Sequence, residues 1–319
     1  MLNDKTILVT GGTGSFGQKF VEVILKEYKP KKIIIFSRDE YKQLLMRKKF
    51  DSPRLRYFLG DVRDSERLHR AFHGVDIIIH AAALKQVPSL EYNPFEAIKT
   101  NVIGAENIIN TAIDNGVKKV LALSSDKAVN PINLYGASKL CSDKLFVAGN
   151  AYSGDVKTKF SVVRYGNVLN SRGSVVPLFR EQRESGVLTL TDDRMTRFWI
   201  TLERGVNFVL DCLKIMQGGE IFVPKIPSMR IFDLAKAVAP ECKYKITGIR
   251  PGEKLHEVLI PEDESHNTYE SKNKFVILTP FQNRKNYRNC KLVKDGFRYS
   301  SDTNTEWISV KGLRKMLSK

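Results

Sequence analysis

Hydroxyl, carboxyl, amine and phenol groups gather in one short stretch of the chain, residues 123–139. The apolar run 120–123 predicts a buried strand, and the Ser/Asp/Asn/Pro cluster behind it cannot continue that strand. We therefore expect four reactive side chains at the carboxyl end of a strand, namely Ser124, Ser125, Asp126 and Lys127.

A helix is predicted to begin near Tyr135, which places Tyr135 and Lys139 one turn apart on the same face. A lysine cation at that distance would lower the pKa of the phenol from its usual value of about 10. The resulting phenolate could take a proton from a hydroxyl group. Tyr-x-x-x-Lys is also a common pair on helix surfaces, so this spacing alone leaves both interpretations open.

The chain has 319 residues and 42% hydrophobic composition, which fits one large α/β domain or two smaller ones. Its apolar runs are far shorter than the ~20 residues of a membrane-spanning helix, and its charged start lacks a signal-peptide core. We expect a cytoplasmic protein without a membrane partner. The cysteines lie far apart, so we expect free thiols and no metal site at Cys141, Cys212, Cys242 and Cys290.

The formal net charge of +17 raises the alternative of a nucleic-acid-binding protein. The lysines and arginines are spread along the whole chain, however, and no recognition motif with interleaved aromatic residues accompanies them. We expect no nucleic-acid partner, because such a positive field would equally attract a small anionic substrate and cofactor.

A glycine-rich turn follows the first predicted strand, residues 6–10, and leads into a helical stretch that runs to about Glu27. Such a turn lets the backbone approach a pyrophosphate closely, and the helix N-terminus supplies unpaired N–H groups. The pattern predicts a dinucleotide-binding fold. The residues expected to hold the cofactor here are Gly11, Thr13, Gly14, Ser15, Phe16 and Gly17.

The second predicted strand, residues 32–36, leads to the position that contacts the adenosine ribose. An acidic residue there would favour NAD, whereas Arg38 beside a serine offers a partner for a 2′-phosphate. We expect NADP, although Arg38 could instead pair with Asp39 or Glu40 at the surface. The cofactor-contacting residues expected in this segment are Ser37, Arg38, Asp39 and Lys42.

Further strands are predicted at residues 55–59, 75–80, 117–123 and 160–164, with a helical region at 93–115. Alternating strands and helices of this length predict a Rossmann-type, doubly wound parallel sheet of the α/β class, with ligands over the carboxyl ends of the strands. His80 is expected to be a packed strand residue. The remaining cofactor-contacting residues expected at these strand ends and helices are Asp61, Val62, Ala81, Ala83, Lys85, Asn101, Ser124, Tyr135 and Lys139.

The motifs together resemble a known family. The Thr-Gly-x-x-Gly-x-x-Gly turn at 10–17, the Ser-x-Asp cluster at 124–126 and the Tyr135/Lys139 pair are similar to those of extended short-chain dehydrogenases/reductases that act on nucleotide sugars. Ser-Asp-Lys-Ala, Asn-Pro-x-Asn-Leu-Tyr-Gly-Ala-Ser-Lys and the segments 164–168, 195–199, 225–229 and 252–257 resemble the inverting UDP-N-acetylglucosamine 4,6-dehydratases that begin pseudaminic acid synthesis. Retaining sugar dehydratases have Asp-Glu where this chain has Asp126-Lys127.

The α/β rhythm breaks after Asn167, where we expect a smaller substrate lobe to begin. The expected division is an NADP-binding domain at 1–167, with 201–223 returning to it, and a nucleotide-sugar lobe at 168–200 and 224–319. A loop at 172–177 and a turn at 249–254 could bind the diphosphate, although the second could be a solvated turn. The expected substrate contacts are Lys85, Ser125, Asn167, Arg172, Gly173, Ser174, Val175, Arg197, Arg250 and Glu253.

The resemblance implies three steps, which are oxidation at carbon 4 of the sugar, loss of water across carbons 5 and 6, and return of the hydride to carbon 6. We hypothesise that Tyr135 takes the 4-hydroxyl proton, with Ser125 or Ser124 on the same oxygen. Asp126 and Lys127 would serve as acid and base at carbons 5 and 6, in an assignment that the sequence leaves open. Lys127 could act as the base if burial lowers its pKa.

Two alternatives remain open at this stage. A nucleotide-sugar 4-epimerase would use the same tyrosine and lysine without the Asp126-Lys127 pair. A non-catalytic NADP-sensing or RNA-binding protein is the other, and Tyr135 and Lys139 argue against it. The resemblance also implies UDP-N-acetylglucosamine as the partner ligand and assembly into a homo-oligomer.

Overall fold

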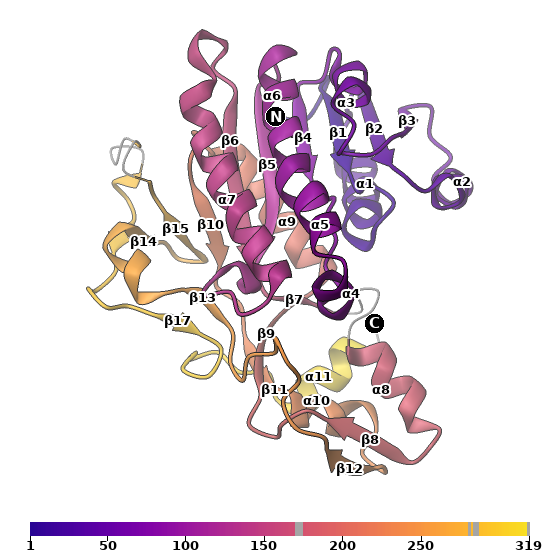
Figure 1. Cartoon of the computed structure of the whole chain (residues 1–319), viewed down its shortest axis with the longest axis vertical. Helices are drawn as coiled ribbons and strands as arrows, with labels where there is room; N and C mark the ends of the chain where they lie inside the picture. Colours follow the sequence, from indigo (N-terminus) through magenta and orange to yellow (C-terminus); the bar gives the residue numbers. More distant parts are fainter. Residues whose placement is uncertain (170–174, 280–281, 283–286, 318–319) are drawn as a thin grey trace.

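The computed structural model describes residues 1–169, 175–279, 282 and 287–317 of the chain. It shows a large α/β part built on one long sheet and a smaller lobe beneath the carboxyl ends of that sheet's strands (Figure 1). The expected fold class is confirmed.

The main sheet contains ten strands within the described residues. Their bounds are β1 (Thr6–Thr10), β2 (Lys32–Ser37), β3 (Leu55–Leu59), β4 (Ile77–His80), β5 (Lys119–Ser125), β6 (Lys159–Tyr165), β10 (Ile221–Pro224), β14 (Thr268–Glu270), β15 (Lys274–Ile277) and β16 (Lys291–Leu292). They lie in the order β16-β14-β15-β10-β6-β5-β4-β1-β2-β3. The seven strands from β10 to β3 pair in parallel, and most of their residues are apolar and buried, as expected for a sheet covered on both faces.

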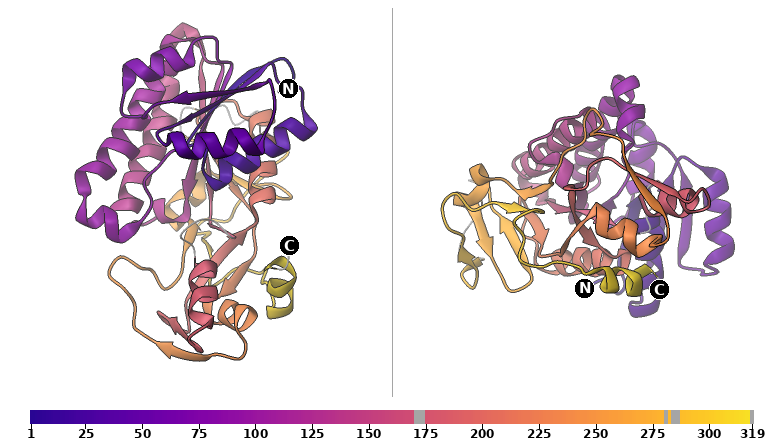
Figure 2. Two further views of the ribbon diagram at one scale, coloured as in Figure 1. Left: turned by 90° about the vertical axis from the view of Figure 1, so that its right-hand side faces the viewer. Right: turned by 90° about the horizontal axis from the view of Figure 1, so that it is seen from below.

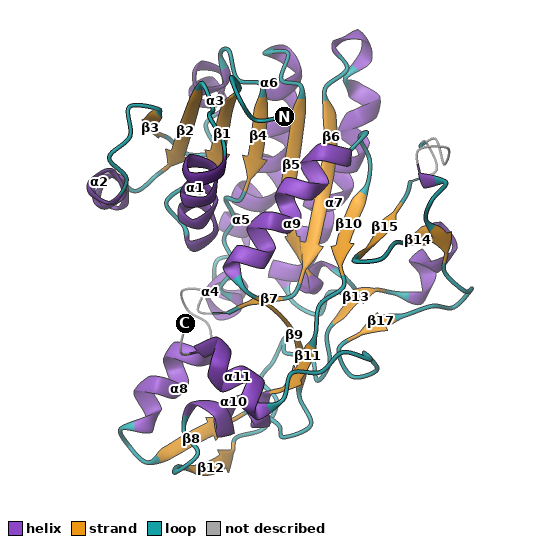
Figure 3. Ribbon diagram, turned by 180° about the vertical axis from the view of Figure 1, so that it is seen from behind, coloured by secondary structure: helices purple, strands orange, loops and turns teal. Residues whose placement is uncertain are grey.

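Helices cover both faces of this sheet. The helices of this part of the chain are α1 (Ser15–Glu27), α2 (Glu40–Lys49), α3 (Ser65–Phe72), α4 (Val87–Tyr92), α5 (Pro94–Ala97), α6 (Gly104–Asp114), α7 (Leu134–Tyr152) and α9 (Leu202–Ile215). Figure 1 shows α6 and α7 in front of the sheet, with α3 beside α6, and Figure 3 shows α1 and α9 on the opposite face. This is the doubly wound arrangement, in which ligands bind beyond the carboxyl ends of the strands.

Several boundaries differ from the expected ones. The strand expected at 117–123 is β5, which extends through Ser125, so both serines lie within the strand rather than after it. The helical region expected at 93–115 consists of α5, the π-helical turn η1 (Ile98–Ile103) and α6. The remaining short helical turns are η2 (Asp126–Ala128), η3 (Gly154–Val156) and η4 (Glu262–Asn267).

The C-terminal part of the chain differs from the expected division. The sequence analysis assigned 224–319 to the lobe, but β15, β14 and β16 extend the main sheet beyond β10 as antiparallel strands. The apolar residues Phe275, Val276 and Ile277 pack into the same core as the Rossmann strands. Only 4 residues of β15 carry this pattern, which is too short a run to distinguish a sheet strand from a lobe strand by sequence.

The lobe has a hydrophobic core of its own, formed mainly by Val176, Phe179, Leu188, Trp199 and Leu234. Figure 2 shows it projecting from the main sheet, with α8, β8 and β12 at its far end. Its elements are β7 (Asn167–Val168), α8 (Val175–Arg183), β8 (Val187–Leu190), β9 (Thr196–Ile200), β11 (Ser228–Arg230), α10 (Ile231–Val238), β12 (Lys243–Ile246) and α11 (Val310–Leu317). The loop expected at 172–177 is therefore helical from Val175 onward.

A short antiparallel pair joins the lobe to the main part. It consists of β13 (Val258–Ile260) and β17 (Tyr299–Ser300), which brings the C-terminal segment close to residues 253–257. The described helices are all too short or too polar to cross a membrane. The described residues form no cluster of His, Cys, Asp and Glu suited to a metal ion, and the cysteines are free thiols as expected.

Candidate active site

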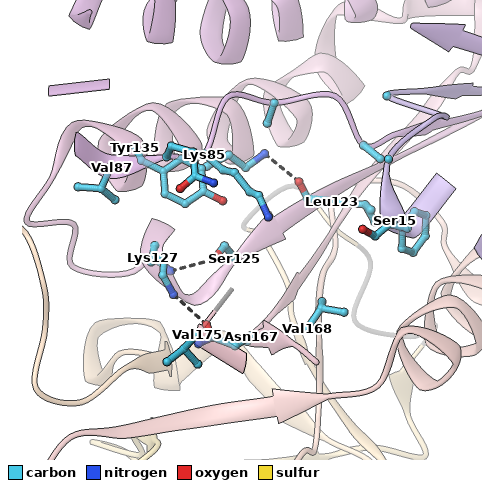
Figure 4. A pocket seen from close by; sticks show the side chains of 18 of the residues that line it. Ser15, Lys85, Val87, Leu123, Ser125, Lys127, Tyr135, Asn167, Val168 and Val175 are labelled. Carbon is cyan, nitrogen blue, oxygen red and sulfur yellow. Dashed lines mark hydrogen bonds between the residues drawn. The ribbon is translucent and has the colours of Figure 1, made fainter. Parts of the chain in front are cut away.

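One cavity of about 1170 Å³ runs along the carboxyl ends of β1, β2, β4 and β5 and continues between the sheet and the lobe. Figure 4 shows its central part, where Tyr135, Ser125, Lys127 and Asn167 lie around one space. The sequence-predicted site residues that line this cavity are Gly11, Thr13, Gly14, Ser15, Phe16, Gly17, Ser37, Arg38, Asp39, Lys42, Asp61, Val62, Ala81, Ala83, Lys85, Ser124, Ser125, Lys127, Tyr135, Lys139, Asn167, Val175, Arg197, Arg250 and Glu253. Asp126 and Asn101 lie behind its wall, and Arg172, Gly173 and Ser174 fall outside the described residues.

The glycine turn forms the floor at one end of the cavity. Gly11 has a φ of 63°, and a β-carbon at this position would meet the Ala81 carbonyl oxygen at 2.9 Å, so the turn lies directly against the end of β4. Helix α1 begins at Ser15 without a side-chain cap among the described residues and without an acid in its first turn. Its first N–H groups therefore remain available for an anion, as a pyrophosphate requires.

The end of β2 presents one basic and one acidic side chain. Asp39 caps α2 by accepting from the Lys42 N–H at 2.9 Å, and its Oδ2 lies 2.5 Å from Lys42 Nζ. The Lys42 side chain and backbone hold the pKa of the Asp39 carboxyl below its usual value. Arg38 is half exposed and reaches Asp61 Oδ2 at 3.4 Å, so it pairs with neither Asp39 nor Glu40.

Asn101 lies in the π-helical turn η1 and does not reach the cavity. Its Oδ1 accepts from the Leu84 N–H at 2.9 Å, and its Nδ2 donates to the Leu84 carbonyl and to Ser138 Oγ, each at 2.9 Å. In the structure Asn101 fixes the loop after β4 that carries Ala83 and Lys85, and its expected cofactor contact stays a prediction. A π-helical turn at such a position is common near functional sites.

Tyr135 stands at the start of α7, against the turn that carries Asp126 and Lys127. Asn133 caps the helix by accepting from the Gly136 N–H at 2.8 Å. A β-carbon on Gly136 would meet the Lys127 carbonyl oxygen at 2.3 Å, so only glycine lets α7 approach this turn so closely. This approach brings the phenol next to Ser125 and Lys127 (Figure 4).

Without cofactor or substrate, the pKa of the Tyr135 phenol is raised. The sequence analysis expected Lys139 to lower it. Burial is the largest cause, while the cation of Lys127 and a hydrogen bond with Ser125 act in the opposite direction. Lys139 is directed elsewhere, since its Nζ donates to the Leu123 carbonyl at 2.8 Å. The cation that acts on the phenol is therefore Lys127.

Lys139 and Ser124 share a carboxylate that the sequence analysis missed. Asp143 accepts from Ser124 Oγ at 2.8 Å and lies 3.6 Å from Arg164 Nε. Burial lowers the pKa of Lys139, and the Asp143 carboxylate offsets only part of this effect. The spacing from Lys139 to Asp143, one further turn along α7, is the sequence signal that could have identified it.

Asp126 and Lys127 form an ion pair on η2. Asp126 is completely buried, and its Oδ1 accepts from Ser125 Oγ at 2.8 Å and from Lys127 Nζ at 2.9 Å. Its Oδ2 is buried without a hydrogen-bond partner among the described residues. Lys127 also donates to Asn167 Oδ1 at 3.1 Å, so β7 contributes to the same cluster.

The pKa of Lys127 is raised, contrary to the expected lowering. Burial acts to lower it, but the carboxylates of Asp126 and Glu257 together outweigh burial. Glu257 Oε1 lies 3.2 Å from Lys127 Nζ and was not expected among the site residues. The sequence analysis proposed only the turn at 249–254 for the diphosphate and used the segment 252–257 for the family resemblance. A single sequence gives no signal that Glu257 approaches η2.

Arg197 holds the lobe segment that carries Glu257. Its guanidinium donates to the carbonyl groups of Thr196, Leu255 and Lys254 at 2.7–3.1 Å, and its Nε lies 3.7 Å from Glu257 Oε1. Although Arg197 lines the cavity, most of its donors are already used by backbone carbonyl groups. Arg250, by contrast, is exposed and lies 4.0 Å from Glu253, so its guanidinium is accessible from the cavity.

Comparisons with known proteins agree with this architecture. The family described as "Polysaccharide biosynthesis protein" matches residues 7–279. The chain is 56% identical to the UDP-N-acetylglucosamine 4,6-dehydratase (inverting) of Campylobacter jejuni, with 100% of this chain and 98% of the relative covered. It is also 47% identical to the UDP-glucose 4-epimerase of Rickettsia conorii, with 83% and 80% covered.

Among solved structures, the chain is similar to Pen from Bacillus thuringiensis, with 39% identity, a TM-score of 0.93 and 100% of this chain and 98% of the other covered. The match extends over the main sheet and the lobe alike. The chain therefore belongs to the polysaccharide biosynthesis protein family and is an extended short-chain dehydrogenase/reductase.

Proposed function

We infer that this protein is an inverting UDP-N-acetylglucosamine 4,6-dehydratase. The observation that carries this inference is the convergence of Tyr135, Ser125 and Lys127, with Asp126 paired behind Lys127, on one cavity that extends from the glycine turn to the lobe. The full-length similarity to a relative of that name supports it. The product would be UDP-2-acetamido-2,6-dideoxy-β-L-arabino-hex-4-ulose, inverted at carbon 5.

The uncapped start of α1 and the Gly11 turn fit the pyrophosphate of a nicotinamide dinucleotide. We propose NADP, because the Asp39 carboxylate is occupied by Lys42 while Arg38 is half exposed at the cavity edge. Charge-assisted hydrogen bonds from a guanidinium suit a 2′-phosphate. When bound, the nicotinamide would accept a hydride from carbon 4 of the sugar and return it to carbon 6.

In the first step, the Tyr135 oxygen would accept the proton of the 4-hydroxyl group of the sugar. Ser125 would donate a hydrogen bond to the 4-oxygen of the sugar during this transfer. Lys127 and Ser125 favour the ionised phenol, and burial opposes it. Lys139, held by the Leu123 carbonyl, would orient the cofactor ribose from the same helix.

In the second step, one group of the Asp126–Lys127 pair would remove the proton on carbon 5, and the other would protonate the departing 6-hydroxyl group. Lys127 lines the cavity, whereas Asp126 is completely buried behind it. Asp126 therefore acts through Lys127 or through a small movement of η2. The carboxylates around Lys127 keep it protonated before substrate binds.

The substrate would lie across the lobe side of the cavity. Asn167 and Val175 line this side, and the Arg250 guanidinium is accessible for the diphosphate. We further propose, on the family resemblance, that the enzyme works as a homo-oligomer in the cytoplasm and supplies pseudaminic acid synthesis for flagellin glycosylation.

A nucleotide-sugar 4-epimerase is the second candidate, and the 47% identity to a relative named UDP-glucose 4-epimerase favours it. The purified protein with UDP-N-acetylglucosamine and NADP distinguishes the two by mass spectrometry. A dehydratase produces a species lighter by one water molecule, whereas an epimerase leaves the mass unchanged. A protein that yields neither the lighter species nor an epimer contradicts both functions.

A further inference from the structure

A second carboxylate, from the lobe, contacts the amine of Lys127. Glu257 Oε1 lies 3.2 Å from Lys127 Nζ, and the glutamate side chain is only 3% exposed. Glu257 and Lys127 both line the cavity, whereas Asp126 does not. The ammonium group is therefore held between a buried carboxylate on η2 and one from the lobe.

The charged groups that face Lys127 come from every element packed around it. Asp126 is its neighbour on η2, Tyr135 approaches from α7, and Lys85 from the loop after β4. On the lobe side, Arg197 of β9 lies near Glu257, and Lys254 Nζ lies 3.9 Å from Glu257 Oε2. Among these groups, Glu257 is the acid that the lobe contributes.

The position of Glu257 is fixed independently of Lys127. Its backbone N–H donates to Ser301 Oγ at 2.9 Å, and the Ser301 N–H donates to its carbonyl oxygen at 2.8 Å. Ser301 Oγ also hydrogen-bonds with Thr196 Oγ1 at 2.7 Å, which ties this point to β9. The carboxylate thus projects from a braced backbone rather than from a free loop.

A purely structural carboxylate would have both oxygens satisfied, because a buried unpaired oxygen costs free energy. Glu257 Oε2 is buried and has no hydrogen-bond partner among the described residues. Glu220 illustrates the contrast, since its two oxygens accept from Ser161, Tyr287 and the backbone at 2.6–2.9 Å.

We propose that Glu257 is a positioning residue that holds the Lys127 amine at the cavity wall for the elimination step. The carboxylate orients the amine by contact, and because it comes from the lobe it makes the acid–base pair depend on the docked lobe segment. This inference rests on the proposed dehydratase function and adds a third residue to the Asp126–Lys127 pair.

The test compares Glu257→Gln with the unaltered protein. The variant keeps an acceptor oxygen but loses the charge, so we expect kcat to fall about 10–100-fold, the range known for groups that orient metal ligands, with KM little changed. Reduced nicotinamide should accumulate, because the variant keeps the Lys127 amine that assists Tyr135 in the first oxidation and loses only the carboxylate that orients this amine for elimination. Removal of the Glu257 charge should lower the pKa of Lys127 by about 1–3 units. The limb of the pH–rate profile that reflects Lys127 should move to lower pH by the same amount, whether Lys127 is the acid or the base.

A second measurement does not depend on activity. In the protein without substrate, the reaction of Lys127 with acetic anhydride can be followed against pH by mass spectrometry of its peptide. Only the neutral amine reacts, so in Glu257→Gln the reaction should begin at lower pH than in the unaltered protein. Glu257→Asp keeps the charge on a shorter side chain, and its midpoint should lie between the other two.

Glu220→Gln is the matched control, because it removes a buried carboxylate that lies away from the cavity. It should lower the melting temperature but leave the reaction of Lys127 and the pH–rate profile unchanged. If Glu257→Gln behaves in the same way as this control, the inference is wrong, and Glu257 is structural. A raised KM with unchanged kcat and pH profile would also overturn it, since Glu257 would then only bind substrate.

The outcomes separate this inference from the proposed function. If the unaltered protein does not remove water from the nucleotide sugar, the dehydratase function fails, and the acetic anhydride experiment still decides whether Glu257 governs Lys127. If Glu257→Gln does not fold, Glu257→Asp provides the same comparison with the same opposing outcomes.

Discussion

Lys127 and Lys139 belong to the same cavity wall, yet their surroundings shift their pKa values in opposite directions. Lys139 is almost fully buried and donates to a neutral carbonyl group, and burial lowers its pKa. Lys127 contacts two carboxylates, and their charges overcome burial and raise its pKa. The direction of the shift is therefore set by the carboxylates in direct contact, because desolvation acts on both amines.

The difference assigns the two amines to different tasks. A lysine held protonated next to two carboxylates is suited to moving protons within the cluster once a substrate changes the local charge. A lysine anchored to a backbone carbonyl is suited to holding a ribose in place. Two neighbouring elements would therefore divide the work, with Lys139 of α7 toward the cofactor and the Asp126–Lys127 pair of η2 toward elimination.

The largest expected effect on turnover follows removal of the Tyr135 hydroxyl group. Tyr135→Phe should abolish turnover while NADP binding stays nearly intact, because only the ionisable oxygen is removed and the ring still packs. Mass spectrometry of the product and a cofactor titration measure the two properties. Near-normal turnover would remove Tyr135 from the mechanism and leave the cation of Lys127 without its proposed target.

Changes in the Asp126–Lys127 pair should uncouple elimination from the first oxidation. In Lys127→Ala, we expect nicotinamide absorbance to rise on addition of UDP-N-acetylglucosamine, more slowly than in the unaltered protein because the cation beside Tyr135 is lost. Little product should form, and the carbon 5 proton should exchange little in deuterated water. Asp126→Asn should permit exchange but slow water loss if Asp126 is the acid. Each defect should be about 10²–10⁴-fold in rate. The reverse pattern would exchange the roles, and full product formation in both variants would contradict the mechanism.

Stability provides a matched pair of variants. Lys127→Met leaves the Asp126 carboxylate buried without its cation and removes one of the cations beside Glu257. The free energy of unfolding should therefore fall by about 3 kcal/mol. Lys139→Met removes an amine whose burial is unfavourable, and the loss should not exceed about 1 kcal/mol. Urea unfolding at neutral pH measures both values. Equal losses would show that the two amines are not as different as their surroundings indicate.

The pH dependence of these variants should differ in sign. The raised pKa of Lys127 stabilises the fold below the usual lysine pKa of 10.5, and this stabilisation is lost as the pH rises through the folded value. The lowered pKa of Lys139 has the opposite effect, because its unfavourable burial is relieved as the pH rises toward 10.5. As the pH rises toward 10.5, the unaltered protein should gain stability from Lys139. Lys139→Met should lose this gain, whereas Lys127→Met should keep it.

The smallest expected effect is at the distant end of the cavity. Arg38→Ala should weaken NADP binding by about 1–3 kcal/mol and NAD binding far less, since only a 2′-phosphate gains the charge-assisted hydrogen bond. Isothermal titration of both cofactors measures the difference. An equal loss for the two cofactors would show that Arg38 does not meet a 2′-phosphate.

The sequence was sufficient for the fold and for most of the cavity wall. The glycine turn, the strand ends and the Tyr135–Lys139 spacing depend on local geometry, which sequence periodicity encodes. Local pattern failed where contacts are long-range. The approach of Glu257 to Lys127 spans 130 positions along the chain, and together with the neighbouring Asp126 carboxylate it raises the pKa of Lys127 instead of lowering it.

Two other features of the structure were not predicted from the sequence. Asn101 was expected to contact the cofactor. In the structure, a π-helical turn directs its side-chain amide to the backbone of Leu84. No residue pattern in the sequence predicted that turn. The strands β14, β15 and β16 are very short. Their residue pattern therefore could not predict that they join the main sheet. The sheet position of β14 to β16 depends on partners far away in the sequence, whereas the contact of Asn101 with Leu84 spans 17 positions.

The brace at Ser301 also bears on how the enzyme is made. Lys127 and Tyr135 are synthesised early, together with the central strands of the sheet, whereas Ser301 follows Tyr135 by more than half the length of the chain. At roughly 5–20 residues per second, this delay is on the order of ten seconds. A ribosome-bound chain could therefore present a folded dinucleotide site well before the lobe carboxylate reaches Lys127, so cofactor loading can precede the assembly of elimination chemistry.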